Sequence, residues 1–334
     1  MSDALELTGN TADQLKQIYV QCPQYHAKIE DKHLLTGHFL RQYHASLFYY
    51  KHFYDDTCVY GDPDSCTDAF YFVCGFNGTP GQIKFGVPSI VKRYGRDVYI
   101  KSLYVEEFSC HHPSWIKYTS HHLEKRRQTM VRDLVEMTNR FPRVRVIVSS
   151  TGFYEFLAVY PELLELKHKL ILYWVSCAPD QVSRSIWQSY FYGFNGFSYR
   201  GMKWFSYPNH QLLRLFNPEC ATRKNWKHDQ QKNTFYKIGL ESRFFCFGLL
   251  WDYASWDCIT FFLDNNLSIY RKSGLQIDIE THVLAGTRDG FWDDSRPEVI
   301  EKTLDKYIRE KRVIYKQSSH LWVVTPENIS ELIV

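Results

Sequence analysis

Residues 144–160 read VRVIVSSTGFYEFLAVY, and this stretch decides the fold class because its apolar pattern changes partway along. Val144–Ser149 alternates valines, as a buried strand does. Residues 152–160 place four large apolar side chains on one stripe of a helix: Phe153, Phe156, Leu157 and Tyr160. Pro161 ends that helix, since proline has no amide donor and collides with the preceding turn. A strand followed by a helix predicts an α/β protein.

The segments around this stretch predict a mixed sheet flanked by helices. Residues 120–140 have the spacing of an amphipathic helix, and Lys169–Ser176 that of a strand. The turn residues of 77–81 indicate a hairpin. Three strands are predicted upstream of the helix: Ala69–Phe76, Gln82–Val91 and Asp97–Phe108. Because two of them are joined by the hairpin, we expect a mainly antiparallel sheet.

The second half of the chain repeats this order of elements. A helix is predicted over 297–311, and strands over 242–252, 256–263, 276–284 and 320–325. No residue identity accompanies the repeated pattern, so coincidence remains an alternative to duplication. We predict two domains, residues 1–178 and 179–334, the second being a degenerate copy of the first if the repeat is real.

Composition excludes several classes of protein. The 40 basic and 37 acidic side chains give a net charge of only +3, which is no footprint for nucleic acid. No signal peptide and no long apolar span is recognisable, so no membrane partner is expected. The nine cysteines never form a Cys-x-x-Cys pair, which argues against disulfides and a zinc ribbon. We therefore expect a cytoplasmic protein with free thiols and an undetermined oligomeric state.

Three segments resemble the GNAT acyltransferase superfamily: Ile100–Glu107, Val144–Ser149 and Gly152–Phe156. The resemblance implies acyl-CoA as cosubstrate, its pantetheine arm between two splayed strands, and a small amine or amino-acid acceptor. The family's glycine-rich turn before the central helix is missing between Ser109 and Val131. Three cations near the start of that helix are predicted to bind the pyrophosphate instead: Lys125, Arg126 and Arg127.

The resemblance also assigns catalytic roles. Tyr154 stands where relatives keep the proton donor for the leaving thiolate, and Glu106 or Glu107 is the nearest carboxylate for the base. The main chain of three residues would pair with the pantetheine amides: Leu103, Tyr104 and Val105. The function predicted on this basis is N-acyl transfer.

Two other functions remain open at this point. One is a non-catalytic binding or assembly protein on a decayed version of the same fold. The other is a hydrolase whose residues converge only in three dimensions, since no Gly-x-Ser-x-Gly motif is found in the chain. The histidines of 110–112 and 121–122 match no zinc spacing, so no metal is predicted.

Overall fold

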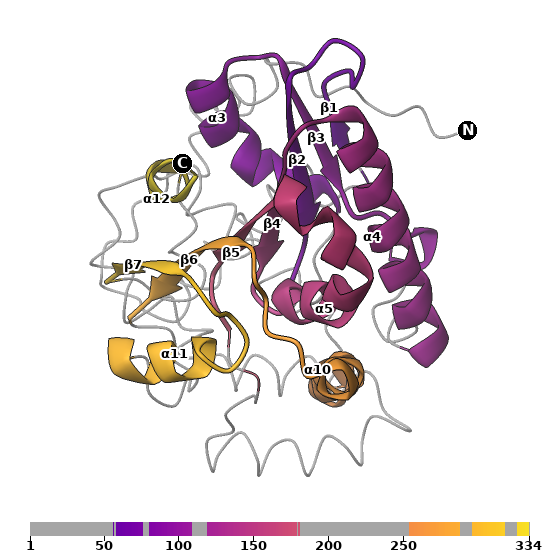
Figure 1. Ribbon diagram of the computed structural model, residues 1–334, viewed down its shortest axis with the longest axis vertical. Coiled ribbons are helices and arrows are strands. Elements are labelled where there is room, and N and C mark those ends of the chain that lie inside the picture. Colours follow the sequence, from indigo (N-terminus) through magenta and orange to yellow (C-terminus); the bar gives the residue numbers. More distant parts are fainter. Residues whose placement is uncertain are drawn as a thin grey trace, which may run out of the picture.

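The computed structural model describes residues 56, 58–75, 80–108, 119–178, 180, 254–287, 296–317 and 326–333. They contain a seven-stranded sheet with the order β1-β3-β2-β4-β5-β6-β7 (Figure 1). β1 is antiparallel to β3, and every other neighbouring pair is parallel. The strands are β1 Val59–Tyr60, β2 Asp68–Val73, β3 Val98–Ser102, β4 Val144–Ser149, β5 Leu170–Val175, β6 Glu280–Gly286 and β7 Arg312–Lys316.

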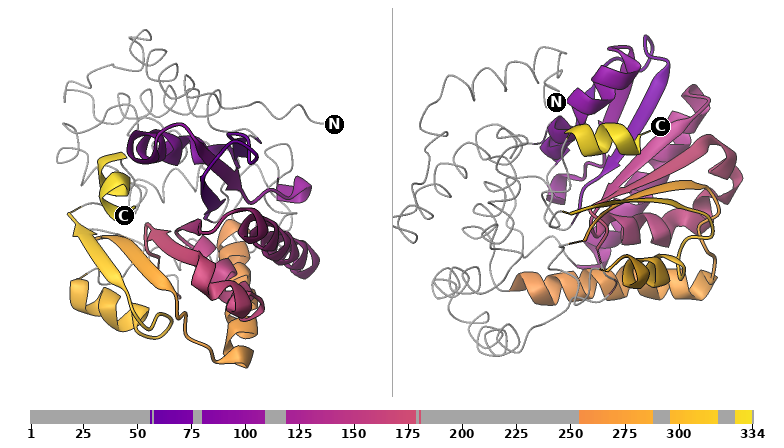
Figure 2. Two further views of the ribbon diagram at one scale, coloured as in Figure 1. Left: turned by 45° about the horizontal axis from the view of Figure 1, so that its top comes forward. Right: turned by 90° about the vertical axis from the view of Figure 1, so that its left-hand side faces the viewer.

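Helices cover both faces of the sheet (Figure 2). On one face α3 and α12 pack together over the strands, and on the other lie α4, α5, α10 and α11. Within the described residues, the α-helices are α3 Ile83–Tyr94, α4 Ser120–Arg140, α5 Gly152–Val159, α10 Ala254–Ser273, α11 Pro297–Leu304 and α12 Pro326–Leu332. The described residues also form three 3-10 segments: η2 Pro80–Gln82, η3 Glu106–Phe108 and η5 Tyr160–Lys169.

Two apolar cores follow from this layering. Along β2, Phe70 and Phe72 point into the core under α3, while Tyr71 and Val73 point into the core under α4 and α5. All six residues of β5 are buried. Strands covered on both faces carry continuous apolar runs, which is why Leu170–Val175 shows no polar alternation.

The local pattern correctly predicted the elements around residues 144–160. The structure confirms the helix over 120–140 and the strand over 144–149, and it confirms the strands near 69 and 170 to within a few residues. The helix that begins at Gly152 ends at Val159, where η5 continues through Pro161.

The prediction of a mainly antiparallel sheet is wrong. Residues 82–91, expected as the second strand of a hairpin, lie in η2 and α3. Ile83, Val87 and Ile90 are all buried on one side of α3, and their spacing of four and three fits a helix. With a helix between them, β2 and β3 pair in parallel.

The resemblance to the GNAT superfamily is also overturned by the sheet. The strands that would have to splay apart are paired along their whole length, from β3 through β2 and β4 to β5. β6 and β7 then extend this same sheet by pairing in parallel with β5 and with each other. The expected domain boundary at 178/179 thus falls between two neighbouring strands.

Three of the elements expected in the second half of the chain can be compared with the structure. The expected strand over 256–263 is part of α10, whereas the strand expected over 276–284 is β6 and the helix expected from 297 is α11. The expected strands over 242–252 and 320–325 lie outside the described residues.

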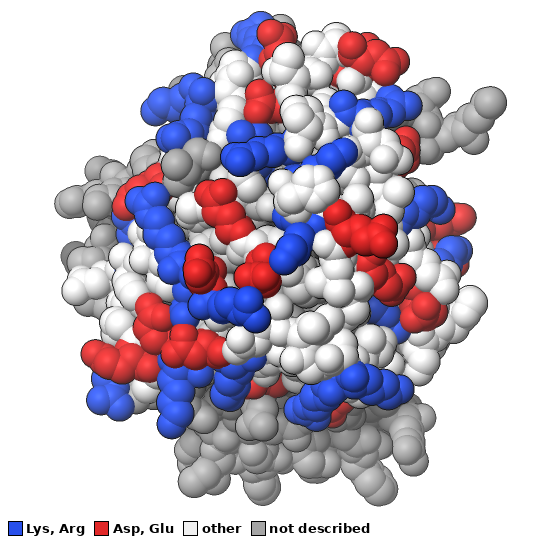
Figure 3. Space-filling view, viewed as in Figure 1, with Lys and Arg blue, Asp and Glu red and all other residues white. Residues whose placement is uncertain are grey.

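Acidic and basic side chains are interspersed on the face shown in Figure 3. Within the described ranges, no helix is long and apolar enough to cross a membrane.

Candidate active site

The turn between β4 and α5 holds a serine in a strained conformation. Ser150 has φ 53°, in the left-handed region, which costs a non-glycine residue about 1–2 kcal/mol. Its amide donates to the carbonyl of Val175 over 2.8 Å, and its carbonyl accepts from the indole Nε1 of Trp174 over 2.9 Å. Strained residues of this kind, held by their surroundings, concentrate at functional sites. Ser150 is partly exposed, so its side chain is within reach of solvent.

Two glycines let the loop after β2 press against this turn. A Cβ on Gly75 would lie 2.8 Å from the carbonyl oxygen of Ser149 and 2.9 Å from the Cβ of Ser150. A Cβ on Gly152 would lie 2.8 Å from the carbonyl oxygen of Val73. Real side chains do not approach so closely, so only glycine fits at either position. The end of β2 and the Ser150 turn are therefore in direct backbone contact.

The turn lies at the edge of the sheet where ligands bind in open α/β proteins. β2 and β4–β7 run in the same direction, so their carboxyl ends share one edge. Ser150 follows the last residue of β4 at this edge. The amides of Thr151 and Gly152 come next, at the start of α5, where the helix dipole is positive.

Buried aromatic side chains pack together next to the turn. The Trp174 ring stacks on Phe153 at 3.8 Å between centroids, and Tyr154 meets both rings edge-on. The Tyr154 hydroxyl is fully buried and donates to the carbonyl of Ala178 over 2.9 Å. Its complete burial holds the pKa of this hydroxyl well above the ordinary value. The predicted proton donor is therefore a structural core residue.

The three predicted pyrophosphate ligands do not form an anion site. Arg126 is 5% exposed and donates to Glu155 over 2.6 Å. Arg127 is also buried and donates to three side chains: Glu124, Asn265 and Asn266. Lys125 is exposed and pairs with Glu107 over 2.5 Å. Each cation is already compensated by a side chain of the protein.

The other predicted residues follow β3 and are not on a splayed strand. The Leu103 amide donates to the carbonyl of Phe72 over 2.8 Å, so this part of the chain stays paired with β2. Leu103 and Val105 are buried and Tyr104 is partly buried. Glu106 and Glu107 begin the 3-10 segment η3, and the hydrogen bond from Lys125 lowers the pKa of the Glu107 carboxyl.

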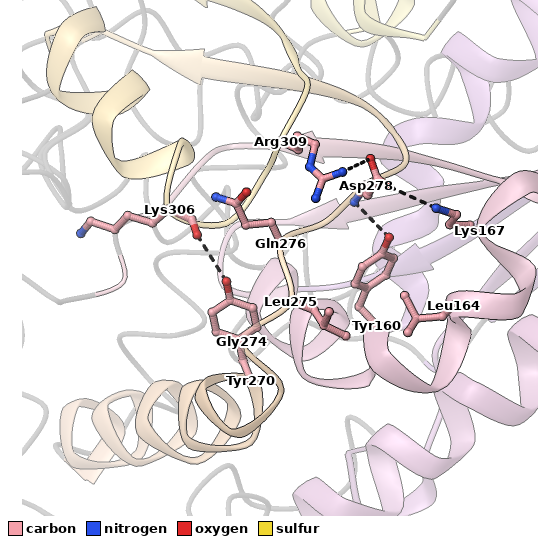
Figure 4. A pocket seen from close by; sticks show the side chains of 10 residues that line it. All are labelled: Tyr160, Leu164, Lys167, Tyr270, Gly274, Leu275, Gln276, Asp278, Lys306 and Arg309. Atoms are coloured by element: carbon pink, nitrogen blue, oxygen red, sulfur yellow. Dashed lines mark hydrogen bonds and ion pairs between the residues drawn. The ribbon is translucent and has the colours of Figure 1, made fainter.

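A depression lies at the opposite edge of the sheet from Ser150 (Figure 4). It has a volume of about 550 Å³ and is bordered by segments that precede β5, β6 and β7. At its rim Asp278 receives ion pairs from Lys167 over 3.1 Å and from Arg309 over 3.4 Å. The Tyr160 hydroxyl accepts from the Asp278 amide. These contacts join η5 to the segments before β6 and β7, remote from Ser150.

Comparison with known proteins gives similar solved structures only. No protein-family model matches the chain, and no curated protein matches it. An enol-lactonase from Burkholderia xenovorans is 11% identical, with 79% of this chain and 88% of that chain covered and a TM-score of 0.47. An alpha/beta hydrolase fold protein from Burkholderia ambifaria is 13% identical, with 83% and 92% covered and a TM-score of 0.47. The thioesterase domain from the curacin biosynthetic pathway is 12% identical, with 83% and 93% covered and a TM-score of 0.46.

The prediction of an acyl-CoA-dependent acyltransferase is wrong, and so is its non-catalytic variant, because both require a GNAT fold. The sheet of this chain is mostly parallel, and its strands are paired where that fold would need them to splay apart. Sequence reasoning missed Ser150 because it searched for glycine two residues before the serine, where this chain has Val148. The signal that was available is a buried strand, two serines, and Gly152 at the start of a helix.

Proposed function

We propose that the protein is a serine hydrolase in which the Ser150 hydroxyl attacks the carbonyl carbon of an ester or thioester. The observation that carries this proposal is the conformation of Ser150, left-handed between a buried parallel strand and a helix. This sharp, strained turn is the one that presents the nucleophile in α/β-hydrolases. The glycine contacts at Gly75 and Gly152 are what such a turn requires sterically.

The backbone around Ser150 supplies the groups for an oxyanion hole. In an α/β-hydrolase turn, the amide after the nucleophile and an amide of the loop after the adjacent strand bind the developing oxyanion. Here these are the amide of Thr151, at the start of α5, and the loop that begins at Gly75. Losing one such donor costs about 10²–10³ in kcat. The proposed site therefore needs no charged side chain to stabilise the tetrahedral intermediate.

The sequence offers a base and an acid in the required order. α/β-hydrolase triads run Ser, then Asp or Glu, then His along the chain. Asp289 comes three residues after the end of β6, and His320 comes four residues after the end of β7. Both lie outside the described residues. Because β6 and β7 are parallel to β4, segments that follow them start at the edge that carries Ser150.

The proposed reaction proceeds through an acyl-enzyme. His320 accepts the proton of Ser150 as its oxygen bonds to the carbonyl carbon, and returns it to the leaving alcohol or thiol. Asp289 holds the imidazole in the required tautomer. Water, deprotonated by the same histidine, then releases the acid and restores the serine.

The two adjacent serines of the turn provide a matched experiment. The purified chain is incubated with a fluorophosphonate probe, and hydrolysis of p-nitrophenyl acetate is measured for Ser150→Ala and Ser149→Ala. We expect Ser150→Ala to lose labelling and at least about 10³ in kcat, because the nucleophile itself is removed. Ser149→Ala should keep both. Labelling that survives Ser150→Ala would show that another residue is the nucleophile and overturn the proposal.

A further inference from the structure

A buried ion pair connects α4 and α5 to the loop that follows β2. The Arg126 Nε donates to Glu155 Oε1 over 2.6 Å, and its Nη2 donates to the carbonyl oxygen of Cys74 over 3.3 Å. The guanidinium lies 4.9 Å from the ring centroid of Phe108. Arg126 and Glu155 are 5% and 1% exposed, so one guanidinium joins three segments inside the protein.

The contact with Cys74 constrains the start of the loop that faces Ser150. A peptide group is planar, so fixing the Cys74 carbonyl also fixes the direction of the Gly75 amide on the same peptide. Gly75 lies directly against the serine, since a Cβ on it would stand only 2.9 Å from the Cβ of Ser150. The position of the loop relative to Ser150 therefore depends on where Arg126 holds this carbonyl.

The contact with Glu155 ties the same arginine to α5. Glu155 is the fourth residue of the helix whose first turn carries the amides next to Ser150. The planar fork of an arginine can bind a carboxylate and a carbonyl in fixed relative directions, which a lysine cannot do. Arg126 thereby sets the distance between the two parts of the proposed oxyanion hole.

Stability alone does not explain this pair. Replacing buried ion pairs with apolar residues is often neutral or stabilising, because burial of both charges is costly. Here the cost is increased, since Glu155 Oε2 is buried without a hydrogen-bond partner among the described residues. A costly arrangement beside a strained serine suggests a gain in positional accuracy.

We propose that Arg126 and Glu155 are positioning residues for the oxyanion hole, an inference that rests on the proposed hydrolase function. They act through Cys74 and the start of α5, without touching the substrate. Their effect is on the transition state, where the oxyanion forms, and leaves ground-state binding unchanged. It therefore appears in kcat and in the affinity for tetrahedral analogues, with KM nearly constant.

The neighbouring Arg127 is a matched control for this proposal. It lies on the same helix, is equally buried and makes a comparable set of polar contacts, but these go to Glu124, Asn265 and Asn266. We would compare Arg126→Lys with Arg127→Lys by kcat and KM for p-nitrophenyl acetate, inhibition by a boronic acid, and urea unfolding. Arg126→Lys should lower kcat about 10- to 100-fold and weaken the boronic acid in proportion, as a misplaced oxyanion donor does. Arg127→Lys should lose similar stability and keep kcat within about threefold.

Two further variants keep the outcome interpretable. Arg126→Met removes both hydrogen bonds and should reduce kcat more than Arg126→Lys, so that the conservative variant gives partial rescue. If either Arg126 variant fails to fold, Glu155→Gln keeps the shape of the pair and should lower kcat about tenfold, because the fork loses its charged partner.

The outcomes separate the two proposals. Equal losses of kcat in Arg126→Lys and Arg127→Lys would overturn the positioning role while wild-type labelling of Ser150 still supports a serine hydrolase. The positioning role would also be overturned if Arg126→Lys raised KM while kcat and the affinity for the boronic acid stayed unchanged. Wild-type protein that is not labelled at Ser150 would refute the hydrolase itself, and the positioning role with it.

Discussion

The indole of Trp174 fixes the carbonyl of Ser150 through a hydrogen bond of 2.9 Å from its Nε1. Trp174 lies on β5 with no exposed surface, and its ring stacks on Phe153, the second residue of α5. One side chain thus supports the turn on both sides of Gly152. A hydrogen bond to the backbone of a strained residue holds a conformation that the residue alone would leave.

Trp174→Phe should therefore reduce both stability and turnover. The substitution keeps an aromatic ring against Phe153 and removes the donor to Ser150. We expect a loss of about 0.5–1.5 kcal/mol in the free energy of unfolding, the net contribution of one hydrogen bond. The loss stays in this range because Ser150 is partly exposed and its carbonyl keeps the Phe153 amide as a second donor. Turnover of an ester substrate should fall by at least about tenfold, as the serine turn relaxes. Urea unfolding and kcat measurements test both effects.

Tyr154→Phe is the control for that experiment. It removes another buried hydrogen bond from the same aromatic cluster, donated to Ala178 instead of to Ser150. Stability should fall by about 1 kcal/mol, with kcat unchanged. A large drop in kcat for Tyr154→Phe would return the tyrosine to the mechanism and contradict its structural role.

The parts of the fold that were predictable are those with a local signal. The valine alternation of 144–149 and the apolar stripe of 120–140 each specify one element without reference to the rest of the chain. The direction of the strands was not predictable in this way. It depends on pairing such as that of β5 with β6, whose residues are separated by more than a hundred positions.

The site was missed for a related reason. The left-handed φ of Ser150 occurs where Gly75 and Gly152 bring two strand ends into backbone contact, and neither the φ nor the contacts are visible in a linear motif. The basic residues caused the opposite error, because they predicted an anion site that the structure does not form. Arg126 and Arg127 look like a cationic helix start in sequence, but tertiary packing buries both against polar side chains.

Ser150→Gly should stabilise the protein while abolishing hydrolysis. Glycine adopts φ 53° without the cost of about 1–2 kcal/mol paid by serine, and loses about 0.5–1 kcal/mol through its freer unfolded chain. The expected net gain is about 0.5 kcal/mol. Ser149→Gly, at the end of β4, should instead lose about 0.5–1 kcal/mol. If both substitutions destabilise equally, the turn at Ser150 stores no strain.

Gly152→Ala tests the close contact between the turn and β2. The new Cβ would stand 2.8 Å from the carbonyl oxygen of Val73 and 3.0 Å from that of Cys74, so backbone must move. We expect a loss of about 2–3 kcal/mol, typical of overpacking. Gly95→Ala is the comparison. At its φ of 80° an alanine would be strained, but no atom lies within 4 Å of the added Cβ. That change should cost only about 1 kcal/mol, and equal costs would contradict the contact.

Buried tyrosines should make the fold sensitive to alkali. Burial raises the pKa of Tyr71 well above its ordinary value, helped by the hydrogen bond to Asp133. Burial likewise raises the pKa of Tyr154, helped by the nearby Cys177 and Asp180. Burial also raises the pKa of Tyr99 to about 12. A raised pKa in the folded state means that the unfolded chain loses its proton first. The stabilisation is therefore complete below about pH 10 and is lost as the pH rises above it.

The slope of the unfolding free energy against pH shows which tyrosines are responsible. Each buried tyrosine that stays protonated in the folded protein contributes about 1.4 kcal/mol per pH unit above pH 10. For Tyr99 the contribution ends near pH 12, where the folded state ionises as well. Urea unfolding at pH 8 to 11 should show a nearly constant free energy at first and then a steep decline. Tyr71→Phe should remove one tyrosine's share of that slope, and a slope unchanged by this substitution would mean that Tyr71 ionises equally in both states.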